Sequence, residues 1–208
     1  VEAKEMARAA VAAAVGVHAY GKREVVVRVN GLETPWIARD IAAVVASQPD
    51  AVLVPKISKP EDIRRARAAL HAAQAPEGVG LWAMIETPLA VLNVGAIAAA
   101  AASSSGVPLE ALVIGTNDLM METGMRATPG RAPLAPVLAQ CVLAARAYGI
   151  AVLDGTFNEL NNWDGFRAEC QQGRDFGMDG KTLIHPRQVQ IANEVFSPNA
   201  DEVIWAEK

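Results

Sequence analysis

A regular alternation of short β-branched runs with longer alanine-rich stretches is the feature that most limits how this chain can fold. Apolar runs of strand length predict strands at 25–29, 51–54, 81–85, 111–114 and 150–153, with a weaker sixth at 180–184. Apolar residues at helical spacing predict helices at about 3–18, 36–47, 60–73, 88–102, 132–148 and 186–195, and a further helix within 161–176. Strands that are apolar on both faces must be covered on both, so the pattern predicts an α/β fold with a parallel sheet.

Two architectures satisfy this pattern, an open doubly wound sheet and a closed (β/α)8 TIM barrel. The sequence has neither GxGxxG after a strand nor GxxxxGK[ST], the phosphate loops that usually accompany doubly wound nucleotide binders. The barrel is therefore favoured. A barrel typically needs about 250 residues, and the predicted strands are two short of closure. We therefore expect residues 1–208 to form one partial TIM-barrel domain that lacks its first two βα units.

Composition excludes several classes of protein. The chain is 51% hydrophobic and 20% charged, which is enough apolar material for a buried core and excludes extensive disorder. Its formal net charge of -4 is small and of the wrong sign for a protein whose main partner is nucleic acid. No apolar stretch reaches the roughly 20 residues of a membrane span. Cys141 and Cys170 form no CxxC pair, so we expect a reduced, cytoplasmic protein.

Polar and ionisable side chains follow five successive predicted strands. In a parallel barrel the carboxyl ends of the strands meet at one mouth, where side chains converge and chemistry is carried out. We therefore expect a row of two cationic and three anionic groups along that mouth. In chain order, the residues at these strand ends are Arg28 with Asn30, then Lys56, Glu86, Asp118 and Asp154.

Glu86 and Asp118 are the most informative of these residues. Carboxylates from neighbouring strand ends can share a Mg2+ ion, which typically takes one or two protein carboxylates and completes its shell with water and substrate oxygens. Mn2+ uses similar ligands. The alternative is that Glu86 caps the helix beginning at Thr87-Pro88, and that Asn117 or Asp118 is an N-cap.

The two cations also have alternative interpretations. Arg28 lies within an apolar run, where a buried guanidinium needs an anion. That anion is either a carboxylate of another strand or a substrate carboxylate or enolate oxygen held by the guanidinium fork. Lys56 is either a Schiff-base lysine or a point charge that extends out of the rim. His185 either forms a structural hydrogen bond or faces the mouth of the barrel. The run Leu119 to Met121 is interpreted as core packing.

Five motifs in one order closely resemble the citrate lyase beta-subunit and malyl-CoA lyase family. The resemblance covers essentially the whole chain, and its motifs are Val27–Asn30, Val54–Lys56, Met84–Pro88, Ile114–Leu119 and Gly177–Gln188. It implies a (β/α)8 barrel and a Mg2+-dependent carbon-carbon lyase. The implied substrate is a CoA thioester of the citryl-CoA or malyl-CoA type, split by retro-Claisen cleavage into acetyl-CoA and a 2-oxo acid.

The resemblance also assigns roles to individual residues. It implies that Arg28 is catalytic and binds substrate oxygens, and that Glu86 and Asp118 hold the metal ion. It further implies that the substrate is bound by Arg28, Glu86 and the run Gly115, Thr116, Asn117 and Asp118. The residues implied to bind CoA are Lys56, Lys181, His185 and Pro186. Members of the family carry an acidic strand upstream and a C-terminal lid, both of which we expect to be missing from this chain. The general acid or base is expected in those segments.

The implied assembly is a homotrimer or a hexamer, or a subunit of a larger lyase complex. Within the same family, a malyl-CoA thioesterase is the alternative activity, in which water attacks the thioester. A CoA-independent pyruvate-class aldolase and an inactive binding subunit are further alternatives. Product analysis distinguishes the lyase from the thioesterase, since one metal site can serve both.

Overall fold

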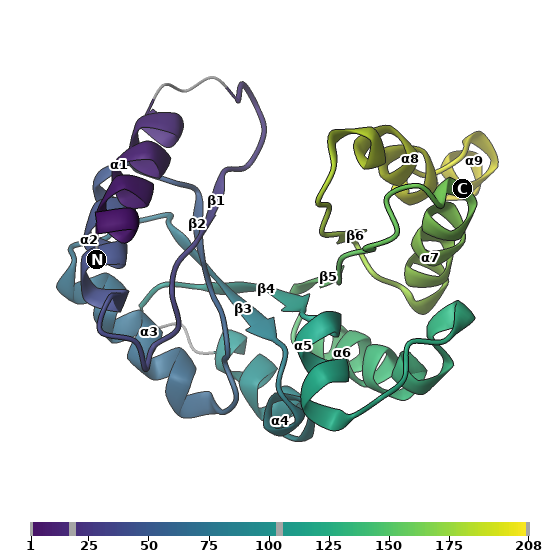
Figure 1. The fold of residues 1–208 in the computed structure, drawn as a ribbon, viewed down its shortest axis with the longest axis horizontal. Coiled ribbons are helices and arrows are strands. Elements are labelled where there is room, and N and C mark those ends of the chain that lie inside the picture. Colours follow the sequence, from purple (N-terminus) through teal and green to yellow (C-terminus); the bar gives the residue numbers. More distant parts are fainter. Residues whose placement is uncertain (1, 17–19, 103–105, 207–208) are drawn as a thin grey trace.

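Six parallel strands form one curved sheet in this computed structural model, which describes residues 2–16, 20–102 and 106–206. The strands are hydrogen-bonded to one another in chain order, so each lies beside the next along the sequence. Figure 1 shows that the sheet curves into a half-barrel, with a gap between its first and last strands. The six strands are β1 (Val26–Arg28), β2 (Ala51–Val54), β3 (Gly80–Ile85), β4 (Leu109–Ile114), β5 (Ala151–Asp154) and β6 (Gly180–Lys181).

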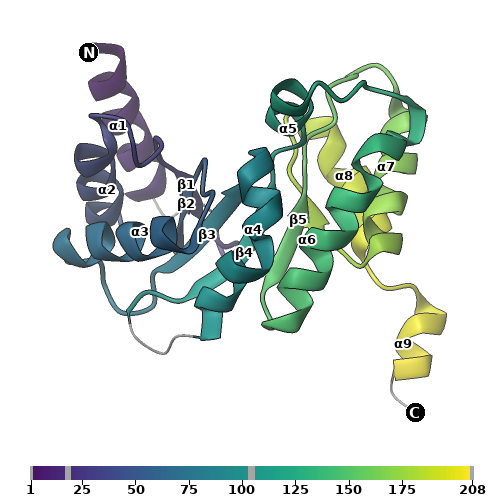
Figure 2. The same cartoon turned by 90° about the horizontal axis from the view of Figure 1, so that it is seen from below.

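The connecting helices cover the outer, convex side of the sheet (Figures 1 and 2). Three of them, α3, α4 and α8, begin at a proline, whose fixed φ and missing N–H suit the first turn of a helix. The helices are α1 (Glu2–Gly16), α2 (Ile37–Ala46), α3 (Pro60–Ala72), α4 (Pro88–Ala98), α5 (Thr116–Thr123), α6 (Ala135–Ala147), α7 (Trp163–Phe176), α8 (Pro186–Phe196) and α9 (Ala200–Ala206), with short 3-10 helices at Ala99–Ala102 and Pro129–Leu134. None of these described helices is long and apolar enough to cross a membrane.

The apolar core has two sides because successive residues of a strand point to opposite faces of the sheet. On the outer side, Val52, Leu81 and Leu112 are fully buried in a large cluster beneath the helices. Burial of such a side chain stabilises the fold by about 1.5–3 kcal/mol. On the inner side lies a smaller cluster of Leu53, Met84 and Val113 with the partly buried Val26, Trp82 and Leu153. The strands are thus apolar on both faces, as the sequence pattern predicts.

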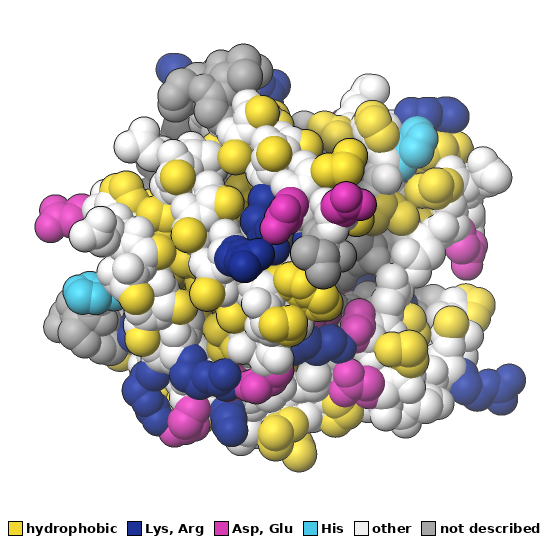
Figure 3. All heavy atoms as spheres, turned by 60° about the vertical axis from the view of Figure 1, so that its left-hand side comes forward, with side chains coloured by type: hydrophobic (Ala, Val, Ile, Leu, Met, Phe, Trp, Pro, Cys, Tyr) yellow, Lys and Arg dark blue, Asp and Glu magenta, His cyan; other side chains and the backbone are white. Residues whose placement is uncertain are grey.

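Charged side chains of both signs are interspersed on the surface. Figure 3 shows Lys and Arg side chains beside Asp and Glu side chains on one face of the molecule. Two arginines of α3 form exposed ion pairs, Arg64 with Glu61 of the same helix and Arg65 with Glu33 between β1 and α2. Exposed pairs of this kind typically stabilise a fold by less than about 1 kcal/mol. The fold therefore depends mainly on the buried apolar clusters.

The predicted α/β fold with a parallel sheet is confirmed. The doubly wound alternative is wrong, because the strands follow one another in chain order and the helices that connect them lie on one side. The last strand is shorter than predicted and ends at Lys181, since the backbone N–H groups of Ile184 and His185 donate to the Gln188 side chain at the start of α8. Two further predicted helices, 88–102 and 132–148, each include a 3-10 segment at one end.

Helices α5 and α9 were not predicted. Helix α5 begins directly after β4, at Thr116, and it contains the run interpreted as core packing. That interpretation holds for Leu119, which is buried, but is wrong for Met121, which is 74% exposed. Because α5 starts at the carboxyl end of β4, its first turn lies at the mouth of the half-barrel.

Candidate functional site

Glu86 and Gly115 lie side by side at the carboxyl ends of β3 and β4. The pairing of Ile85 with Ile114 continues beyond the strands, and the Gly115 N–H donates to the Ile85 carbonyl at 2.9 Å. A Cβ atom on Gly115 would lie 2.4 Å from Cβ and 2.8 Å from Oε2 of Glu86, far inside contact distance. Glycine at position 115 is therefore what leaves room for the Glu86 side chain at this edge of the sheet.

Glu86 is a buried residue, only 5% exposed, and its Oε1 accepts a hydrogen bond of 2.9 Å from the backbone N–H of Lys56. Burial raises the pKa of Glu86 above its usual range, and the negative charge of Asp118 adds to the effect, although the Lys56 N–H opposes it. The capping interpretation of Glu86 is wrong, because the N-cap of α4 is Thr87, whose Oγ1 accepts from the Ala90 N–H. Glu86 is thus a buried carboxylate that forms no ion pair with the described part of the chain.

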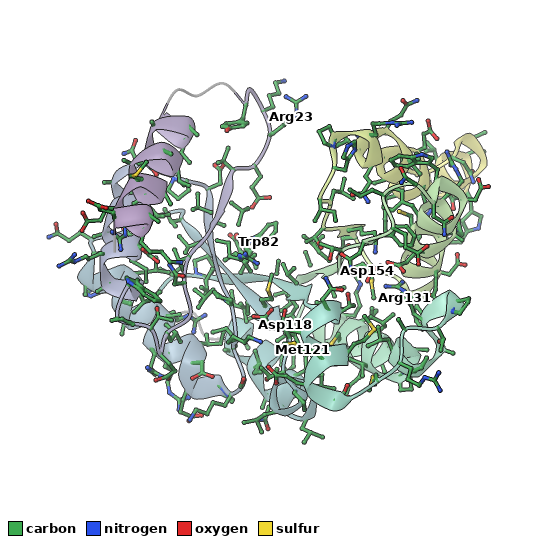
Figure 4. The ribbon with its side chains drawn as sticks, in the orientation of Figure 1. Arg23, Trp82, Asp118, Met121, Arg131 and Asp154 are labelled. Atoms are coloured by element: carbon green, nitrogen blue, oxygen red, sulfur yellow. The ribbon has the colours of Figure 1, made fainter. Side chains whose placement is uncertain are left out.

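Asp118 lies in the first turn of α5, beside the carboxyl end of β4 (Figure 4). Its side chain is 38% exposed, and its Oδ1 accepts a hydrogen bond from the Lys56 ammonium at 2.5 Å. The residue at the N-cap is Gly115, which has no side chain, so the capping interpretation is wrong for Asn117 and Asp118 too. Both predicted metal ligands are therefore free of a capping role.

Lys56 connects the two carboxylates. Its backbone N–H donates to Glu86, while its Nζ donates to Asp118 and, at 3.0 Å, to Glu122 of α5. Partial burial acts to lower the pKa of Lys56, but the hydrogen bonds to Asp118 and Glu122 outweigh it and raise that pKa. A Schiff-base lysine needs a neutral amine. The raised pKa therefore disfavours that alternative and favours a point charge.

Arg28 ends β1 with its side chain exposed, between the buried Val27 and Val29. The expectation of a buried guanidinium is wrong, because alternate residues of β1 face the open inner side of the sheet. No ion pair or hydrogen bond of this guanidinium is found among the described residues, which leaves its fork open to an anion. Its positive charge acts to lower the pKa of Glu86, so the two groups share one mouth.

The carboxylates of Glu86 and Asp118 fit a hard divalent cation. Within the described ranges, no group of three or more His, Cys, Asp or Glu side chains is placed to hold a metal ion. Mg2+ does not need such a group, because one or two carboxylates commonly suffice when water and substrate oxygens complete its shell. Both carboxylates already accept hydrogen bonds from one residue, Glu86 from the backbone N–H of Lys56 and Asp118 from its ammonium. The chemistry of these donors therefore suits Mg2+ or Mn2+.

Thr116 and Asn117 face away from this pair. Thr116 is buried and its side chain lies against Gly155, where a Cβ atom would be 2.3 Å from Oγ1. The Asn117 and Asn158 amides form a hydrogen bond of 2.7 Å across to the loop after β5. Both predicted residues line a pocket of about 540 Å3 between α5 and the start of α7. They thus border the neighbouring pocket rather than Glu86.

Asp154 and Lys181 are not at the mouth, and their predicted roles need correction. Asp154 is completely buried and faces α7, where its carboxylate accepts hydrogen bonds from Arg131 at 2.8 and 3.0 Å and from Lys181 at 2.9 Å. The Lys181 ammonium is equally buried and also donates to Glu169 at 2.6 Å and to the Gly155 carbonyl at 2.6 Å. With these partners, it is not free to bind CoA.

Arg131 is a residue that the sequence does not reveal. It precedes α6 with a φ of 53°, directly after Gly130 with a φ of 72°. This turn directs its guanidinium toward Asp154, as Figure 4 shows. A Pro-Gly pair before the arginine is the sequence signal for an irregular turn, but it gives no indication of the partner.

His185 and Pro186 begin α8. The His185 Nδ1 accepts from the Arg187 N–H at 3.1 Å, and Pro186 occupies the first helical position. This agrees with the structural interpretation of His185, and a contact of either residue with CoA stays a prediction. The Arg187 guanidinium lies 4.5 Å from the ring centroid of Trp163, a cation-π contact that the sequence analysis missed.

Replacement of Gly115 by alanine tests the close approach to Glu86. Gly115→Ala is expected to destabilise the fold by about 1–3 kcal/mol through overpacking, and to weaken Mn2+ binding, because the new methyl group displaces the carboxylate. Gly95→Ala in α4 is the matched control, since nothing lies within 4 Å of its Cβ position. Calorimetric titration with Mn2+ and thermal unfolding measure both effects. An unchanged Mn2+ affinity in Gly115→Ala would show that Glu86 does not bind the ion.

Comparison with known proteins gives two informative relatives. The chain is 46% identical, over 189 residues, to a (3S)-malyl-CoA thioesterase of Cereibacter sphaeroides. The aligned region covers 91% of this chain and 62% of that protein. It is 34% identical, over 205 residues, to the citrate lyase subunit beta of Leuconostoc mesenteroides subsp. cremoris, covering 96% of this chain and 66% of that protein. The chain thus spans less than two thirds of the length of the thioesterase.

These comparisons correct the predicted activity. The carbon-carbon lyase expected from the motifs is contradicted by the higher identity to the thioesterase, a hydrolase. The physical reason is that the same carboxylates and guanidinium serve either reaction. A metal ion and an anion-binding arginine stabilise negative charge on oxygen whether a carbon-carbon bond or a thioester bond breaks.

A solved structure and a family model agree with the resemblance drawn from the motifs. Protein CitE of Mycobacterium tuberculosis, in complex with magnesium, acetoacetate and coenzyme A, matches with a TM-score of 0.66 and 25% identity over 88% of this chain and 64% of that one. The model described as HpcH/HpaI aldolase/citrate lyase matches residues 1–186. The chain therefore belongs to the HpcH/HpaI aldolase/citrate lyase family.

Proposed function

We propose that this chain carries the active site of a CoA thioesterase that hydrolyses a malyl-CoA type thioester to the free acid and CoA. The observation that carries the proposal is the 46% identity, over 91% of the chain, to a (3S)-malyl-CoA thioesterase. The site supports it, because the Arg28 guanidinium, which has no partner among the residues that the structure describes, and two carboxylates suited to a metal ion lie at one mouth. A substrate with both a carboxylate and a thioester presents the oxygens that such groups bind.

Each residue at the mouth has a distinct part in this proposal. Arg28 binds the substrate carboxylate with its guanidinium fork and holds the thioester carbonyl at the end of β3. Glu86 and Asp118 hold Mg2+ or Mn2+, and the magnesium and coenzyme A bound by protein CitE support this assignment. When bound there, the ion supplies positive charge that polarises a substrate oxygen. Lys56 holds both carboxylates in position through its backbone N–H and its ammonium.

The half-barrel is proposed to be part of a closed (β/α)8 barrel in the whole protein. The described sheet leaves β1 and β6 as open edges, and a barrel removes both edges by pairing them with further strands. The greater length of the thioesterase relative is consistent with further elements. Assembly as a trimer or hexamer, and a general acid or base in a lid, stay predictions from the resemblance.

The experiment that tests the proposed activity follows the two classes of product separately. The natural full-length protein is incubated with malyl-CoA and Mg2+, and free thiol and 2-oxo acid are each measured. The proposal predicts free thiol without oxo acid. Arg28→Lys is expected to lower kcat/KM by about tenfold to a hundredfold, because a point charge loses one charge-assisted hydrogen bond of the fork.

Arg167→Lys is the matched control, since Arg167 of α7 forms an exposed ion pair with Glu194 of α8. It is expected to retain wild-type kinetics. Oxo acid without thiol, or near wild-type activity in Arg28→Lys, would contradict the proposal. Formation of neither free thiol nor 2-oxo acid would favour the CoA-independent aldolase or the inactive subunit.

A further inference from the structure

Lys56 binds the candidate metal ligands by two different groups. Its backbone N–H lies 2.9 Å from Glu86 Oε1, and its Nζ lies 2.5 Å from Asp118 Oδ1. The same Nζ lies 3.0 Å from Glu122 Oε1. One residue thereby fixes a carboxylate at the end of β3, the neighbour of β2, and two carboxylates of α5, the helix that follows β4.

The backbone of Lys56 is in the left-handed region, with a φ of 56°. This conformation costs a residue with a side chain roughly 1–2 kcal/mol. Gln48 and Gln74 share it, but both directly follow the C-cap of a helix, where left-handed residues are common. Lys56 instead follows β2, so no helix end explains its conformation. In this conformation the backbone N–H of Lys56 points toward Oε1 of Glu86.

The charges around Lys56 are unbalanced in favour of anions. Glu86, Asp118 and Glu122 carry three negative charges around a single ammonium, and Arg28 provides a second positive charge at the mouth. Asp118 and Glu122 are separated by four residues on α5, so their side chains share one face of the helix and repel each other. The ammonium between them offsets this repulsion. Three carboxylates still outnumber the two cationic groups, so a further positive charge at the mouth is electrostatically favourable.

We propose that Lys56 is a placeholder for the divalent cation: its ammonium occupies Asp118 until the ion binds and then moves to Glu122 alone. The inference rests on the proposed metal site and adds a residue that controls its affinity. The ammonium donates to Asp118 and Glu122 at the same time, so the movement releases the first hydrogen bond and keeps the second. Both partners lie on one helix face, so a rotation of the flexible lysine side chain suffices, and the backbone N–H keeps its hold on Glu86 throughout.

Two effects of opposite sign follow from this role. Without the metal ion, Lys56 keeps three carboxylates from repelling one another and so stabilises the free protein. With the ion, its positive charge competes for Asp118 and repels the metal, so it weakens metal affinity. A residue that only supported the fold would change stability without tightening the binding of the ion.

The test is a titration of the full-length protein and its Lys56→Met variant with Mn2+, followed by electron paramagnetic resonance and calorimetry, together with thermal unfolding. Methionine matches the length of lysine without its charge and leaves the backbone N–H in place. The Kd for Mn2+ is expected to fall by roughly tenfold. The Tm of the metal-free protein is expected to fall, and saturating Mn2+ is expected to restore most of the loss.

Two further variants separate the explanations. Lys56→Arg keeps the charge and is expected to bind Mn2+ as the wild type does. Lys22→Met makes the same change of net charge in a pocket at the amino ends of the strands, lined also by Asp50 and Glu110, and is expected to leave the Kd unchanged. An unchanged or higher Kd in Lys56→Met would overturn the placeholder role while leaving the thioesterase proposal intact. A wild-type protein that binds no Mn2+ would overturn both the metal site and the placeholder.

Discussion

Glu86→Gln and Asp118→Asn are each expected to lower metal-dependent turnover by at least about 10²–10³-fold while leaving the fold intact. Each variant removes a negative charge at the mouth, and electrostatic groups that act on developing charge are typically worth this much. The amides match the carboxylates in size, so packing against Gly115 and β4 is retained. Turnover at rising Mg2+ concentration, Mn2+ affinity and thermal unfolding are the measurements.

Glu61→Gln is the control for this pair of variants. Glu61 is an exposed carboxylate in the first turn of α3 that forms an ion pair with Arg64. Its loss is expected to leave turnover and Mn2+ affinity unchanged. Wild-type turnover of Glu86→Gln or Asp118→Asn at saturating Mg2+ would contradict the assignment of these residues as metal ligands.

Asp154→Asn is expected to destabilise the fold by about 3–5 kcal/mol, the cost of breaking a buried ion pair by removing one partner. The change leaves the buried Lys181 ammonium and the Arg131 guanidinium with a single carboxylate, Glu169. For a chain of this length the Tm is expected to fall by roughly 10 °C. Urea unfolding monitored by circular dichroism measures the free energy directly.

The exposed pair of Arg167 and Glu194 provides the matched comparison. Glu194→Gln removes one carboxylate of an ion pair at the surface, where the loss is expected to be below about 1 kcal/mol. A loss of similar size in Asp154→Asn would show that the buried cluster contributes little to stability. That result would leave no reason for the left-handed turn at Arg131.

The sequence predicted the sheet because its strands are apolar on both faces and are separated by helical spacing. The same reasoning placed Arg28, Lys56, Glu86 and Asp118 at one edge, since parallel strands end together. It failed for Asp154. A strand buried on both sides has no polar alternation, so the sequence does not reveal which face its last residue takes, and Asp154 faces α7.

Other features depend on contacts between residues that are distant in the sequence. The short helix α5 was missed because Gly115 and Asn117 are typical of loops, whereas the structure starts the helix at Thr116. The burial of Lys181 depends on Asp154 and Glu169, which no local pattern connects to it. The choice between hydrolysis and carbon-carbon cleavage was also wrong, because one set of charged residues suits both reactions.

Hydrolysis of malyl-CoA in water enriched with 18O is the most direct test of the central claim. Attack of water on the thioester carbonyl places one 18O atom in the carboxylate of the released malate and frees one thiol for each malate formed. Mass spectrometry of the products of the full-length protein is expected to find this label. Formation of a 2-oxo acid and acetyl-CoA, with no labelled malate, would contradict the thioesterase assignment.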